Sequence, residues 1–112
     1  MKRGAGIAVG LATVFLGGIF TGSMAEAKEG DAAAGEARYA QTCVNCHGPG
    51  GKGMASFPKI GGKDVSFITM RLEQYRAGEM VGPNSALMIP MATDLSDAEI
   101  ANIAAYLSSL EP

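Results

Sequence analysis

Two cysteines and a histidine lie together in one pentapeptide, Cys43-Val44-Asn45-Cys46-His47. Two thiols three positions apart can each add to one of the two vinyl groups of a single haem. The imidazole of the next residue can then bind the iron as its proximal ligand. This spacing is the attachment motif of c-type haem. It predicts one covalently bound haem c, attached through Cys43 and Cys46, with His47 as a ligand of the iron.

Other uses of these residues fit the sequence less well. The chain has only two cysteines and one histidine, so a four-ligand zinc site has no second cysteine pair or histidine to complete it. A thioredoxin-like dithiol would call for a neighbouring strand–helix–strand pattern, which the sequence lacks. A disulfide between the two cysteines is the simplest alternative to haem attachment.

A haem iron with one histidine needs a sixth ligand, or it stays open to small molecules. Because there is no second histidine, the candidates are the methionine sulfurs after the N-terminal segment: Met54, Met70, Met80, Met88 and Met91. Met54 lies too close in sequence to His47 to cross the ring easily, and Met70 falls in an expected helix, where we expect it in the core. Position alone leaves Met80, Met88 and Met91 open, because all three lie in a long loop that could cover the distal face.

The N-terminus has the pattern of an export signal. A basic start, Met1-Lys2-Arg3, precedes an uncharged stretch with an apolar centre over residues 7–20, and small residues allow cleavage after Ala25 or Ala27. The apolar centre is short and interrupted by glycines, whereas a membrane-spanning helix needs about 20 mainly apolar residues. We therefore expect a cleaved signal peptide over residues 1–27, a single domain over residues 28–112, a periplasmic location and no membrane span after cleavage.

The expected domain is small and slightly acidic. Its 85 residues are near the size at which a hydrophobic core alone gives marginal stability, so a buried haem would add needed core surface. Without residues 1–27 the chain has seven basic and ten acidic residues, a net charge of −3. This charge argues against nucleic acid as a partner, because nucleic-acid binding calls for a basic surface. We expect Lys52, Lys59 and Lys63 to form a solvated face.

The rest of the sequence predicts three helices, at about residues 31–42, 64–77 and 96 to just before Pro112, with no strand. Asp31 can cap the first helix, and Ser96 with Glu99 forms a capping box for the third. Four apolar residues share one face of the third helix: Ile100, Ile103, Ala104 and Leu107. Gly35 and Tyr39 share a face of the first helix, so we expect a close helix contact there. Residues 48–62 and 79–95, rich in Gly and Pro, are expected to be loops.

In its motifs and their order, the chain resembles the small class I bacterial cytochromes c, in particular the short soluble carriers and the halves of dihaem cytochromes. The resemblance covers nearly all of residues 28–112. The segments that carry it are Gly30-Asp31, Gly35 with Tyr39, Cys43–His47, Phe57–Gly62, Tyr75–Gly78, Met88–Asp97 and Ile103–Leu107. It implies an all-α cytochrome c-like fold, with three main helices and loops wrapped around one haem.

The resemblance also implies roles for single residues. The family's ligating methionine lies seven residues before the leucine that precedes the capping serine, which here gives Met88 as the sixth ligand, counted from Leu95. Pro58 matches the proline whose carbonyl accepts a hydrogen bond from the proximal imidazole, and such a bond strengthens the histidine as a donor. The pairs Gly35/Tyr39 and Ile103/Tyr106 match the positions at which the first and last helices cross.

Ligation by one histidine and one methionine saturates the iron and favours its ferrous form. We therefore expect an electron-transfer protein and no enzyme: a periplasmic one-electron carrier. Its partners would be a donor reductase or dehydrogenase and an acceptor oxidase or reductase, docked briefly through a small interface, with the carrier itself a monomer. The alternative is an electron-accepting subunit of a dehydrogenase complex such as a flavocytochrome. A gas-binding or peroxidase-like protein would need an open sixth position.

Overall fold

The computed structural model describes residues 29–112, together with residues 4, 6, 10, 12–13 and 17–18. The expected cleavage sites at Ala25 and Ala27 lie outside the described residues, as does most of the expected signal peptide. Among the residues that are described, no helix has the length and apolar character that crossing a membrane requires.

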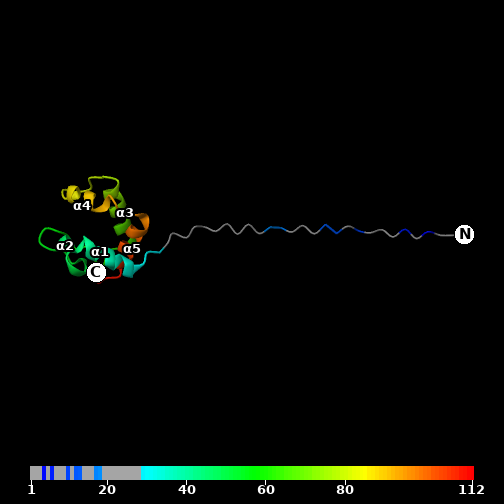
Figure 1. Ribbon diagram of the computed structural model, residues 1–112, viewed down its shortest axis with the longest axis horizontal. Coiled ribbons are helices and arrows are strands. Elements are labelled where there is room, and N and C mark those ends of the chain that lie inside the picture. Colours follow the sequence, from blue (N-terminus) through cyan, green and yellow to red (C-terminus); the bar gives the residue numbers. More distant parts are fainter. Residues whose placement is uncertain (1–3, 5, 7–9, 11, 14–16, 19–28) are drawn as a thin grey trace.

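The described part of the chain is helical (Figure 1). The elements are α1 (Ala32–Gln41), α2 (Val44–His47), the 3₁₀ turn η1 (Pro49–Gly51), α3 (Val65–Arg76), α4 (Ser85–Ala92) and α5 (Asp97–Ser108). Extended pairing within residues 29–112 is limited to one bridge between Met54 and Phe57. The all-α prediction is confirmed, and the three expected helices correspond to α1, α3 and α5.

Local capping sets the starts of α1 and α5, as the sequence predicted. The Asp31 carboxylate accepts hydrogen bonds from the backbone N–H groups of Ala33 and Ala34 at the start of α1. At the start of α5, the Ser96 hydroxyl and the Glu99 carboxylate each accept from the other residue's backbone N–H, which completes the capping box.

Helices α1 and α5 cross in close contact at Gly35. A Cβ atom added to Gly35 would lie only 1.9 Å from the backbone oxygen of Asn102. Beside this contact the rings of Tyr39 and Tyr106 pack at a tilt, with centroids 5.5 Å apart. The predicted close approach through the glycine is therefore confirmed, and it holds the end of α1, where the pentapeptide begins, against the C-terminal helix.

The core lies along α5, which α1 and α3 both contact. All four residues of the predicted apolar face are buried: Ile100, Ile103, Ala104 and Leu107. Helix α3 contributes less than expected, because among its residues only Ile68 is buried. The expectation that Met70 belongs to the core is wrong, since its side chain is 44% exposed. Met70 lies two positions from both Ile68 and Leu72, so the helical repeat turns it away from their side.

Helix α4 corrects the expectation of a continuous loop over residues 79–95. It forms despite Pro90 in its interior. The buried hydroxyl of Ser85 accepts hydrogen bonds from the backbone N–H groups of Val81 and Gly82, at 2.9 Å each, and so fixes the preceding turn. At the other end, Ala92 is completely buried in the core. These tertiary contacts, rather than intrinsic helix propensity, stabilise the helix.

Candidate cofactor site

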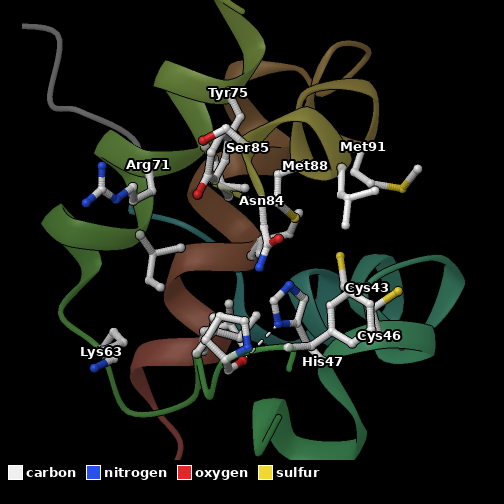
Figure 2. Close-up of a pocket in the computed structure, with 18 of the residues that line it drawn as sticks. Cys43, Cys46, His47, Lys63, Arg71, Tyr75, Asn84, Ser85, Met88 and Met91 are labelled. Carbon is white, nitrogen blue, oxygen red and sulfur yellow. Dashed lines mark hydrogen bonds between the residues drawn. The ribbon is translucent and has the colours of Figure 1, made fainter. Parts of the chain in front are cut away.

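A cavity of about 590 Å³ lies in the concave side of the fold, between the segment that follows α2 and the helices α3 and α4 (Figure 2). Its volume lies within the range of about 300–1,000 Å³ that is usual for small-molecule and cofactor sites. Its apolar lining includes Ile60, Phe67, Ile68, Leu72, Ile103 and Leu107. All five residues proposed from the sequence to bind the cofactor also line it: Cys43, Cys46, His47, Pro58 and Met88.

His47, at the end of α2, forms one face of this cavity. Its side chain is buried, and its Nδ1 lies 3.0 Å from the backbone oxygen of Pro58. Because a carbonyl can only accept, Nδ1 carries a proton, and in the neutral ring Nε2 then has a free electron pair. This is the tautomer that binds a metal through Nε2, with a carbonyl fixing the orientation of the ring. The structure thus brings Pro58 beside His47, eleven residues away in the chain.

Glycines allow the chain to fold back from His47 to Pro58. Gly48 has φ +75° and Gly53 has φ +83°, conformations that L side chains rarely adopt. The Gly53 N–H donates to the backbone oxygen of His47 at 2.7 Å. A Cβ atom on Gly53 would lie 2.7 Å from the backbone oxygen of Phe57, so a larger residue would push the Pro58 segment away from the histidine.

The two thiols lie together at one edge of the cavity (Figure 2). Both cysteines are free; Cys43 is half-buried and Cys46 is exposed. Burial raises the pKa of the Cys43 thiol above its ordinary value, and the nearby Arg38 guanidinium only partly opposes this. The Cys43 side chain is therefore a protonated thiol at neutral pH.

Met88 lies on the opposite side of the cavity from His47, on α4. Its side chain is half-buried and directed toward the cavity. Met91 also lines the cavity, but its side chain is 48% exposed and its sulfur lies farther from the space above His47. The other candidates do not line the cavity. Met80 is 65% exposed, and Met54 packs beside Gly48. Of the methionines considered from the sequence, Met88 has the position that suits a ligand opposite the histidine.

The donor set and the walls of the cavity fit a haem. One imidazole and one thioether face each other, two thiols lie at one edge, and apolar side chains surround the space between. Sequence reasoning missed several polar residues of the lining, among them Arg71, Asn84 and Ser85. Arg71 could have been found, because its spacing of three from Ile68 places it near the same side of α3. In Figure 2, Arg71 and Lys63 lie across the cavity from the cysteines.

The comparisons with known proteins agree with this site. The family described as cytochrome c matches residues 32–111. Cytochrome c-554(548) of Halomonas halodenitrificans is 49% identical over 83 residues, which are 73% of this chain and 99% of that protein. The thiosulfate dehydrogenase electron acceptor of Stutzerimonas stutzeri is 35% identical over 69 residues, 61% of this chain and 32% of that protein.

A solved structure shows the same fold. The structure of cytochrome c4 from Acidithiobacillus ferrooxidans superposes with a TM-score of 0.66 at 32% sequence identity. The match covers 74% of this chain and 51% of that one, so the chain spans about half the length of that relative. With an all-α fold around a cavity that carries the attachment pentapeptide, the chain belongs to the cytochrome c family: it is a class I c-type cytochrome, an electron-transfer protein with covalently bound haem c.

Proposed function

We propose that the chain carries one haem c, attached at Cys43 and Cys46 and bound through its iron by His47 and Met88. The observation that carries this proposal is the placement of the His47 imidazole opposite the Met88 thioether, with both thiols at the same edge of one cavity. When bound, the haem supplies a reversible one-electron couple at its iron. The ring and the apolar walls then complete the core of a domain that is otherwise small.

The residues around the iron have distinct tasks in this proposal. The Pro58 carbonyl holds the His47 ring in the metal-binding tautomer. With haem bound, Met88 would supply the second protein ligand of the iron, which would leave substrates and oxygen no open site, and a thioether ligand favours the ferrous state. A site whose two ligands stay in place in both redox states suits electron transfer rather than substrate chemistry.

We extend the same proposal to the division of the chain into segments and to its role in the cell. Residues 1–27 are a cleaved signal peptide and residues 28–112 are the haem domain, which acts in the periplasm as a monomeric carrier. Its donor is a reductase or dehydrogenase and its acceptor an oxidase or reductase. The basic, apolar and small-residue regions at the N-terminus support export, and the net charge of −3 suits a dissolved protein that docks briefly.

The test compares Met88→Ala with Met91→Ala in exported, haem-loaded protein. Optical spectra of the ferric form should show a weak deep-red band in the wild type and in Met91→Ala, and no such band in Met88→Ala. If the band is lost in Met91→Ala and kept in Met88→Ala, Met91 is the ligand of the iron and Met88 is not. A wild type without the band, whose ferrous form binds carbon monoxide readily, would refute the saturated site and with it the carrier function.

A second candidate is the electron-accepting subunit of a dehydrogenase. It is favoured by the relative from Stutzerimonas stutzeri that is named as the electron acceptor of thiosulfate dehydrogenase. Size-exclusion chromatography of a fresh extract from the native organism separates the two functions. A carrier elutes at the size of the free domain, about 11.5 kDa or less. A permanent subunit co-elutes with a dehydrogenase.

A further inference from the structure

The Tyr39 hydroxyl has a place in the structure that helix packing does not explain. The ring packs against Tyr106 at the crossing of α1 and α5, a contact that needs no hydroxyl. The residue is only 2% exposed, and its hydroxyl donates a hydrogen bond of 2.5 Å to the backbone oxygen of Gly48. Gly48 directly follows His47, so this buried hydroxyl is bonded to the chain next to the proximal ligand.

From Gly48 a series of backbone hydrogen bonds leads back to the imidazole. The same Gly48 oxygen accepts from the Gly51 N–H at 3.2 Å, which closes the 3₁₀ turn. The Gly51 oxygen in turn accepts from the N–H groups of residues 60 and 61, at 2.8 and 3.0 Å. These residues closely follow Pro58, whose oxygen accepts from His47 Nδ1. The hydroxyl therefore secures the turn on which the Pro58 segment rests.

We propose that Tyr39 is a positioning residue for the proximal histidine: its hydroxyl fixes the turn Gly48–Gly51 and thereby the distance between the Pro58 carbonyl and His47 Nδ1. The inference rests on the proposed ligation of iron by His47. A short Nδ1–H···O bond makes the imidazole a stronger donor, which stabilises ferric iron and lowers the reduction potential. If the turn loosens, that bond lengthens and the potential rises.

The Tyr39 hydroxyl is a hydrogen-bond donor at neutral pH. Burial raises the pKa of Tyr39 to about 12. The phenol is thus protonated at neutral pH and can donate its hydrogen bond to Gly48.

The experiment compares Tyr39→Phe with Tyr106→Phe in the haem-loaded protein. Each variant removes one hydroxyl from the same pair of rings, but within residues 29–112 the Tyr106 hydroxyl makes no hydrogen bond. The readouts are the midpoint potential and the NMR resonance of the His47 Nδ1 proton in the diamagnetic ferrous state. Tyr39→Phe should raise the potential and move that resonance upfield, as a weaker hydrogen bond requires. Tyr106→Phe should change neither.

The proposal is overturned if Tyr39→Phe leaves both readouts at their wild-type values, or if both variants shift them equally. Should Tyr39→Phe fail to yield folded haem protein, 3-fluorotyrosine at position 39 replaces it, because it keeps the ring and makes the hydroxyl a stronger donor. Both readouts should then shift in the opposite direction, and unchanged values would refute the role. The deep-red band of the wild type tests the proposed iron ligands separately, whatever the outcome at Tyr39.

Discussion

Replacing Gly35 with alanine should destabilise the domain, although alanine is the better helix former. The added Cβ would lie 1.9 Å from the Asn102 oxygen and 2.9 Å from the Tyr106 Cβ, whereas ordinary contacts begin near 3.4 Å. The two helices would have to separate by about 1.5 Å at this point. The atoms in the way belong to the backbone and to a Cβ, so a change of side-chain rotamer cannot relieve the overlap.

The size of the effect follows from two opposing terms. Overpacking of a tight contact costs about 1–3 kcal/mol, and a contact between rigid helices belongs at the upper end. The higher helix propensity of alanine returns about 1 kcal/mol. The net loss is about 2 kcal/mol, which for a domain of this size lowers the melting temperature by about 8–16 °C.

The assay is reversible unfolding of the ferric protein in guanidinium chloride, followed by circular dichroism and by haem absorbance. Gly82→Ala is the control for the glycine-to-alanine change, because a Cβ at Gly82 meets no atom of a non-neighbouring residue within 4 Å and its φ is not in the left-handed region. Gly82→Ala should match the wild type or exceed its stability by up to about 1 kcal/mol. If Gly35→Ala is as stable as Gly82→Ala, the close crossing of α1 and α5 does not exist as described.

Three further changes test other parts of the structure. The backbone N–H of Ser96 and, as a smaller cause, the Arg38 guanidinium lower the pKa of Glu99. Glu99→Gln keeps the capping box but loses the ion pair with Arg38, so it should lower the free energy of unfolding by about 0.5 kcal/mol at pH 7. Because this pKa is depressed in the folded state, the difference from the wild type should be present above the ordinary glutamate pKa and disappear as the pH falls through the lowered folded-state pKa. Urea titrations at pH 7 and at a series of lower pH values would show it. Ser85→Ala leaves the backbone N–H groups of Val81 and Gly82 without this acceptor and should cost about 0.5–1.5 kcal/mol in the same assay. An unchanged midpoint would contradict the role of this hydroxyl in forming α4. Leu107→Ala, at a position 2% exposed, should cost about 2–5 kcal/mol, and a loss below 1 kcal/mol would place Leu107 outside the core.

Local patterns predicted the parts of the fold that local interactions determine. The capping residues Asp31 and Ser96 lie within three residues of the N–H groups that they bind, so sequence alone located the starts of α1 and α5. The pentapeptide is equally local, since its three reactive groups are neighbours whatever the rest of the chain does. The close helix contact at Gly35 could also be predicted, because a glycine on a helix face allows another backbone to approach closely.

The parts that depend on distant contacts were harder to predict. Helix α4 has a proline in its interior, which argues against a helix there. The hydrogen bonds of the Ser85 hydroxyl and the burial of Ala92 stabilise it, and neither can be predicted from the neighbouring residues in the sequence. The pairing of Pro58 with His47 depends on the turns between them, and only the family resemblance pointed to it. Met70 was misassigned although the helical repeat already placed it opposite Ile68.

The single histidine of this chain has a consequence for how the haem-bearing polypeptide refolds. In an unfolded chain with haem at Cys43 and Cys46, His47 is tethered next to the iron and no other imidazole exists to compete for it. A wrong histidine bound to the iron would have to be released before folding could finish. Here the remaining nitrogen bases are amines, which are protonated in mildly acidic solution. The sequence that builds the redox site therefore also removes competing imidazoles from its folding. Near pH 5, the ligation step that remains in our proposal is the selection of Met88 from among the methionine sulfurs of the chain.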